Sequence, residues 1–98
     1  MGIVDDIKTT LRISNTAYDT EIVDLISAAR SDLMLSGILE SKANDNADPL
    51  IRRAITVYVK ANFGWNNPDA ERLQQSYDML KMHLSLSQEY KQYYLCYG

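Results

Sequence analysis

The chain has 98 residues, a formal net charge of -3 and a hydrophobic fraction of 46%, values typical of a single small globular domain. This composition excludes a disordered or fibrous protein. The excess of carboxylates produces a field that repels phosphate backbones, so nucleic-acid binding is disfavoured. Only Arg52 and Arg53 are adjacent among the scattered basic residues, and the sequence therefore predicts no basic stripe.

The N-terminal residues and the cysteine content indicate the compartment. Cys96 is the single cysteine, which excludes an intramolecular disulfide and fits a reducing solvent. Asp5 and Asp6 stand where a signal peptide needs basic residues, and no apolar run approaches the roughly 18 residues of a membrane span. We expect a protein of cytosol-like solvent with no membrane contact.

Two amphipathic helices are predicted in the first part of the chain. The first follows from an apolar stripe of Ile3, Val4, Ile7 and Leu11. The second is predicted to start between Thr16 and Asp19 and to end at Gly37, because glycine readily takes the left-handed conformation that ends helices. Its apolar stripe consists of Ile22, Ile26, Ala29 and Leu33. The polar segment 38–47 then reads as an exposed loop.

A third helix is predicted from Asp48 and Pro49 to Gly64. Asp48 is suited to accept the free N–H groups of a helix start, and Pro49 loses nothing in the first turn. The predicted buried face of this helix consists of Ile51, Ala54, Ile55, Tyr58, Val59 and Phe63.

A fourth helix is predicted to start after Asn67, Pro68 and Asp69, with a stripe of Ala70, Leu73, Tyr77, Leu80 and Leu84. Beyond His83 the period changes, because Leu84 and Leu86 alternate with serines as in a strand or an extended edge. The predicted fold is therefore all-α, a compact domain of about four short helices with an extended C-terminal tail. No linker or repeat divides the chain, so residues 1–90 form the helical domain and residues 91–98 a Tyr-rich tail of the same domain.

Chemistry-bearing motifs are scarce. His83 is the only histidine, so a zinc site cannot be assembled around histidines, and the few glycines cannot form a phosphate-binding loop. The acidic pairs of Asp5 with Asp6 and Asp69 with Glu71 each fall in a first helical turn, where the helix dipole explains them. The sequence predicts no catalytic residue, no cofactor and no metal ligand, and hence no enzyme.

A small helical regulator or DNA-binding module is the alternative. The last two predicted helices, joined by residues 63–67, resemble a helix-turn-helix, and the second would offer Arg72, Gln74 and Gln75 to bases. Asp69 and Glu71 at its start would repel the phosphates at the groove.

The best candidates for a contact surface are aromatic. Trp65 either covers the small core or meets a partner. The closing segment QEYKQYYLCYG, residues 88–98, holds Tyr90, Tyr93 and Tyr94, and tyrosine is enriched at interfaces, so we expect the tail to mediate assembly. A tail folded against its own domain, or a disordered one, are the alternatives.

Two segments carry a family resemblance: LRISNTAYDTEIVDLISAARSDLMLSG, residues 11–37, and DPLIRRAITVYVKANFGWNNPDAERLQQSYDMLKMHLSLSQEY, residues 48–90. With the opening helix they resemble the head-tail connector proteins, also called adaptor or head-completion proteins, of long-tailed bacteriophages. The similarity covers nearly all of residues 3–90. The shared features are the helix ending in Leu-Arg-Ile, the stop at Gly37 and the last helix running into Leu84, Leu86 and Tyr90.

The resemblance implies a structural virion protein whose copies form a ring beneath the portal and extend the DNA channel. Its implied partners are further copies of itself, the portal protein and the next connector or tail protein, while DNA passes through without specific binding. It implies assembly in the cytoplasm of the bacterial host. By the same resemblance Leu84, Leu86 and Tyr90 begin an extended segment that reaches a neighbour, whereas residues after Tyr90 match no shared pattern.

Overall fold

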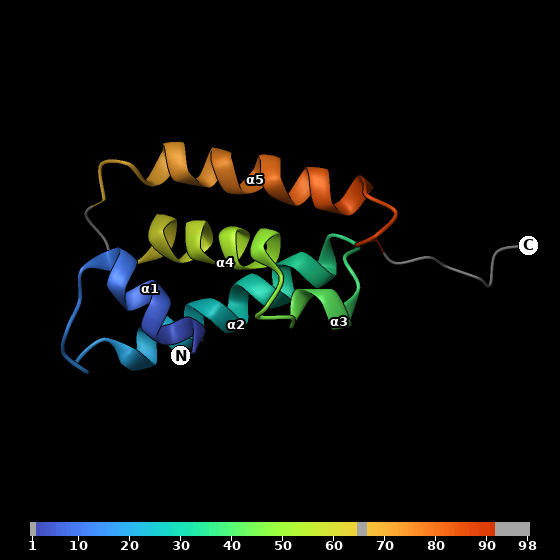
Figure 1. The fold of residues 1–98 in the computed structure, drawn as a ribbon. Coiled ribbons are helices and arrows are strands. Elements are labelled where there is room, and N and C mark those ends of the chain that lie inside the picture. Colours follow the sequence, from blue (N-terminus) through green and yellow to red (C-terminus); the bar gives the residue numbers. More distant parts are fainter. Residues whose placement is uncertain (1, 65–66, 92–98) are drawn as a thin grey trace, which may run out of the picture.

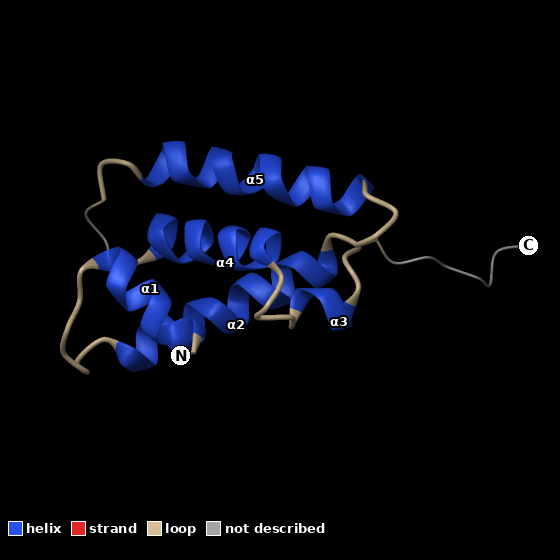
Figure 2. Ribbon diagram, viewed as in Figure 1, coloured by secondary structure: helices blue, strands red, loops and turns tan. Residues whose placement is uncertain are grey.

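The computed structural model describes residues 2–64 and 67–91, and five helices follow one another in them (Figures 1 and 2). They are α1 (Ile3–Leu11), α2 (Asp19–Leu35), α3 (Glu40–Ala43), α4 (Pro49–Asn62) and α5 (Ala70–Leu86). No strand occurs in the described ranges, where the one extended pairing is an antiparallel bridge between Ile38 and Lys91. The all-α prediction is confirmed.

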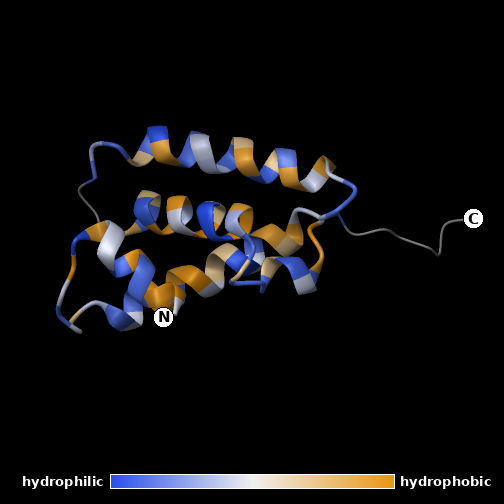
Figure 3. Cartoon of the chain, in the orientation of Figure 1, coloured by the Kyte–Doolittle hydropathy of each residue, from blue (hydrophilic) through white to orange (hydrophobic). Residues whose placement is uncertain are grey.

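The central element is α4, which packs against α5 on one side and against α2 on another, with α1 beside it (Figure 1). Its buried residues are Ile51, Ala54, Ile55, Val57, Val59 and Ala61. Val57 and Ala61 lie outside the predicted stripe, because a helix covered on several sides buries more than one face. Hydrophobic and hydrophilic residues interleave along all the long helices, as expected for amphipathic helices that share a core (Figure 3).

The predicted start signal of α4 and the predicted glycine end signals act as expected, whereas the first residues of α2 and α5 have no side-chain cap. One carboxylate oxygen of Asp48 accepts the backbone N–H groups of Leu50 and Ile51, at 2.9 and 3.3 Å, which fixes the start of α4. Gly37 and Gly64 follow α2 and α4 with φ angles of 98° and 73°. This left-handed region is one that glycine enters without steric cost.

The prediction of an exposed loop over residues 38–47 is wrong. This segment contains α3, and Ile38 and Ala43 are buried in the core. The Arg30 guanidinium donates a hydrogen bond of 2.8 Å to the Ala43 carbonyl and another to the Asn46 side chain. Arg30 belongs to α2, so the polarity of residues 38–47 alone could not predict these two hydrogen bonds.

The prediction of an extended edge at Leu84 and Leu86 is also wrong, because α5 continues through Leu86. Leu84 is 3% exposed and extends the stripe of Tyr77 and Leu80, whereas Leu86 is 71% exposed on the solvent side of the same helix. An alternation of only two leucines fits both a strand and a helix that is buried on one side. The helical packing of α5 against α4 decides between them.

We predict a difference between these two leucines. Leu84→Ala should lower the free energy of unfolding by about 2 to 4 kcal/mol, because it removes a buried side chain and leaves a cavity. The matched variant Leu86→Ala should change it by less than about 0.5 kcal/mol. Urea denaturation followed by circular dichroism measures both, and equal losses would contradict a helical path through Leu86.

Candidate functional site

The predicted contact residues are divided by the structure. Tyr90 is 6% exposed, and Leu84 and Tyr90 both belong to the core of their own chain, while Leu86 is open to solvent. Trp65, Tyr93 and Tyr94 lie outside the described residues. Of the six candidates, Leu86 is therefore the one that the structure shows to be exposed to solvent.

Tyr90 closes the domain through three contacts. Its hydroxyl donates a 2.8 Å hydrogen bond to the Asp48 carboxylate, and its carbonyl accepts the Leu39 N–H at 2.8 Å. The Lys42 ammonium lies 5.3 Å from the centroid of its ring. Asp48 thus caps α4 with one oxygen and holds the last turn of the described chain with the other.

The two titratable groups of this contact shift in opposite directions. Burial tends to raise the pKa of Asp48, but the hydrogen bonds from Tyr90, Ile51 and Leu50 and the nearby Lys42 charge together lower it below its ordinary value. Burial and the bond to Asp48 raise the pKa of Tyr90 to about 12. The ionised carboxylate and the neutral phenol are therefore the stable pair.

A second tyrosine and carboxylate pair joins α2 to α5. The buried Tyr77 hydroxyl donates to Asp32 at 2.7 Å, and the Lys81 ammonium donates to the same carboxylate oxygen at 3.0 Å. Burial, followed by the bond to Asp32, raises the pKa of Tyr77. Burial also tends to raise the pKa of Asp32, but the bonds from Tyr77 and Lys81 outweigh this effect and lower it. Both pairs satisfy polar groups inside the fold and leave none of them poised for catalysis.

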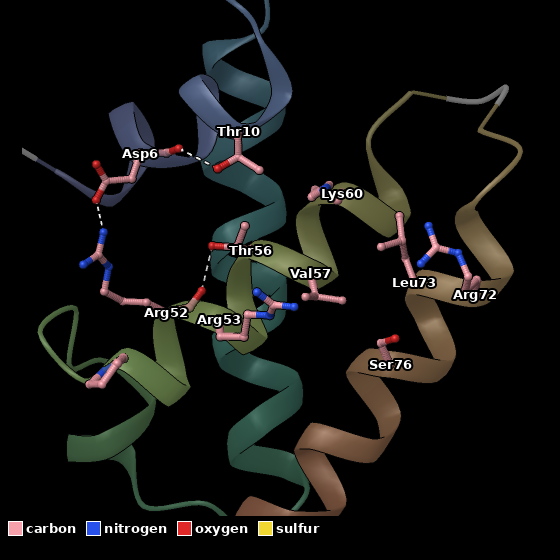
Figure 4. A pocket seen from close by; sticks show the side chains of 11 residues that line it. Asp6, Thr10, Arg52, Arg53, Thr56, Val57, Lys60, Arg72, Leu73 and Ser76 are labelled. Atoms are coloured by element: carbon pink, nitrogen blue, oxygen red, sulfur yellow. Dashed lines mark hydrogen bonds and ion pairs between the residues drawn. The ribbon is translucent and has the colours of Figure 1, made fainter.

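A basic groove lies between α1, α4 and α5 (Figure 4). Two adjoining hollows of about 480 and 400 Å³ share Arg53, Val57, Arg72 and Ser76, and a third adjoins the first at Lys60 and Leu73. We call the three hollows together the basic groove. Five cationic side chains line it: Arg12, Arg52, Arg53, Lys60 and Arg72.

The cations of the basic groove differ in their partners. Arg52 forms an ion pair with Asp6, and Arg72 lies 3.5 Å from Asp69 in an exposed pair. Arg53 and Lys60 have no ion pair with any residue of the described ranges. The groove therefore holds unneutralised positive charge.

The expectation of scattered basic residues is wrong for this face. The five cations come from α1's end, α4 and the start of α5, and only packing brings them together. One signal was present: Arg53 and Lys60 are seven residues apart, two helical turns, and so lie on the same side of α4. No local sequence pattern predicted that Arg12 and Arg72 lie next to this side of α4.

The described part of the chain offers little for chemistry. It contains no group of three His, Cys, Asp or Glu side chains that could hold a metal ion. One member of each acidic pair noted in the sequence forms an ion pair, since Asp6 contacts Arg52 and Asp69 contacts Arg72 at the surface. His83 lines the end of the groove beside Met79. No helix in residues 2–64 and 67–91 has the length and apolarity to cross a membrane.

A sequence profile of the family described as Phage connector protein matches residues 3–91, a span that contains all five helices. The chain belongs to the phage connector family. Searches of curated proteins and of solved structures gave no significant match. The family match confirms the resemblance described from the sequence. A phage connector is a structural component of the virion that associates with other head or tail proteins.

The Asp48 and Tyr90 contact of this connector predicts a pH dependence. Because the folded-state pKa of Asp48 lies below the unfolded value near 3.8, its contribution to stability is present above about pH 4 and is lost as the pH falls through the folded pKa. Asp48→Asn should therefore lower stability at pH 7 and flatten the loss of stability in acid.

Tyr90→Phe is the matched variant, since it removes only the hydroxyl. It should cost about 1 to 2 kcal/mol at pH 7, and in its background Asp48→Asn should cost less than it does in the unmodified chain. Thermal or urea unfolding between pH 2.5 and 7 measures both effects. Additive losses in the double variant would argue against the bond.

Proposed function

We propose that this connector forms a closed ring of copies beneath the portal, extends the DNA channel and joins the head to the tail. The observation that carries the proposal is the family match, which covers the domain from α1 to the bridge at Lys91. Subunits of such a ring meet through two different surfaces, and the contact closes by rotation. The portal and the next connector or tail protein are the proposed partners above and below.

The charge of the chain supports a passive role toward DNA. A net charge of -3 repels phosphates, so DNA slides through the ring without specific binding. The protein acts without catalysis, as a scaffold that is assembled in the cytoplasm of the bacterial host and retained in the virion.

The tail and the last turn of α5 form the proposed contact with a neighbour. Leu86 presents a large apolar side chain at the end of α5, and Met79 and Met82 precede it along the exposed part of that helix. Trp65, Tyr93 and Tyr94 are the aromatic residues assigned to the same role. Leu84 and Tyr90 support them from inside the domain, by fixing where the tail leaves it.

A DNA-binding role is the second candidate, and the basic groove is the observation that favours it. Arg53 and Lys60 have no ion pair among the described residues and lie on one side of α4. A short duplex titrated at two salt concentrations tests this role, because phosphate contacts weaken steeply as salt rises.

We predict assembly of the full chain on a portal. Light scattering over a concentration series, with electron microscopy of the largest species, should show a closed ring either for the chain alone or after addition of the portal protein of its phage. A chain that stays monomeric at all concentrations and ignores the portal would contradict the proposed function.

Removal of residues 92–98 isolates the role of the tail. The cut leaves Lys91, which pairs with Ile38, so the helical content should stay unchanged by circular dichroism. The concentration needed for half-assembly should rise by about tenfold or more, since aromatic side chains contribute heavily to the binding energy of interfaces. Unchanged assembly would remove the tail from the contact surface.

A further inference from the structure

Two surfaces of complementary charge lie on opposite sides of α4. One is the basic groove between α1, α4 and α5. On the other side is α2, which runs behind α4 in the view into the groove (Figure 4). Because Ile22, Ile26 and Leu33 of α2 point into the core, the opposite side of α2 faces away from the groove.

The outward side of α2 carries two carboxylates, and most of its other side chains are small. We call it the α2 face; its exposed residues are Thr20, Glu21, Asp24, Ser27, Ala28, Ser31 and, in the last turn, Leu35, with the exposed Val23 at its edge. Asp24 lies directly opposite the buried stripe and has no ion pair or hydrogen-bond partner in the described ranges. Glu21, one turn before it, accepts only an exposed N–H from Gly64. The nearest cation on this helix, Arg30, is turned toward Ala43 and Asn46.

The groove is shaped to receive carboxylates. Arg53 from α4 and Arg72 from α5 line the same two hollows, so a carboxylate between the helices meets a guanidinium from each wall. Val57 and Leu73 add apolar surface beside these charges. Clustered like charges repel one another, and an incoming anion relieves that repulsion.

We infer that the basic groove of one copy binds the α2 face of the next copy, with Asp24 entering between Arg53 and Arg72. The inference rests on the proposed ring, and it adds a second pair of surfaces to the proposed contact through the tail and the end of α5. A contact between two different sides of a subunit repeats head to tail, which is the arrangement that generates rings. The small side chains at positions 27, 28 and 31 let the α2 backbone approach the groove closely.

The groove suits a protein partner better than duplex DNA. Its cations line hollows between helices. Asp6 and Asp69 line the hollows as well, and Glu71 is exposed on the first turn of α5, so phosphates that approach along the groove meet three carboxylates. A single carboxylate directed at Arg53, which has no ion pair among the described residues, meets less of this repulsion than a run of phosphates.

A charge swap tests the contact. Asp24→Arg and Arg53→Glu should each raise the concentration needed for half-assembly by about tenfold or more, and the double variant should restore assembly to within about threefold of the unmodified chain. Both positions are exposed on helices, so circular dichroism and thermal unfolding should stay unchanged. Glu40→Arg, an equal change of charge on α3, is the control and should leave assembly unaffected.

The outcomes separate this inference from the function on which it rests. A ring formed by the unmodified chain but insensitive to both single variants would overturn the inference and leave the connector ring standing. Losses in the single variants without rescue in the double variant would also overturn the pairing. No ring from the unmodified chain, with or without the portal, would overturn the proposed function itself. A salt-dependent shift of duplex DNA abolished by Arg53→Glu, with assembly unchanged, would make the groove a nucleic-acid site.

Discussion

The burial of α4 is the constraint on which the rest of the structure depends. Fourteen residues form this helix, and six of them are buried, because α1, α2 and α5 all pack against it. A helix covered on so many sides has few directions left for its charged side chains. The side chains of Arg52, Arg53 and Lys60 project from α4 into the opening between α1 and α5. This opening is the basic groove. The basic groove is thus a consequence of how the core is packed.

Two carboxylates hold the elements around α4 in place. Asp48 joins the start of α4 to Tyr90, 42 residues away, and Asp32 joins α2 to Tyr77, 45 residues away. Each bond pairs a phenol with an ionised carboxylate, a stronger hydrogen bond than one between neutral groups. A chain of this size has a small core, so polar contacts between distant elements help to specify how the helices pack as well as to stabilise the fold. Through Asp48 the end of the helical domain is fixed beside α3, and the tail begins from that fixed position.

The sequence predicted what local patterns determine and missed what distant contacts determine. The Asp48 cap and the positions of Gly37 and Gly64 follow from nearby residues, and the structure confirms them. The apolar stripes also follow from nearby residues, and they are confirmed in part, since the α4 stripe did not include the buried Val57 and Ala61. The burial of Ile38 and the short α3 depend on Arg30 and Tyr90, which no window around residue 40 contains. The strand-like reading of Leu84 and Leu86 failed because two alternating leucines also fit a helix buried on one side. The basic groove was missed because its members come from three helices.

The uneven distribution of charge connects the groove to the passage of DNA. Five of the ten Lys and Arg residues line the groove together with two of the thirteen carboxylates, which leaves five cations against eleven carboxylates on the rest of the chain. In a ring closed through the groove and the α2 face, subunit contacts would also cover Glu21 and Asp24, and five cations against nine carboxylates would stay exposed. The assembled surface would then repel phosphates more strongly than the free subunit does. In the proposed ring, one arrangement of charge would thus serve two requirements, since the cations that would attract a neighbouring copy are the ones that would have to be covered for DNA to pass freely through the proposed channel.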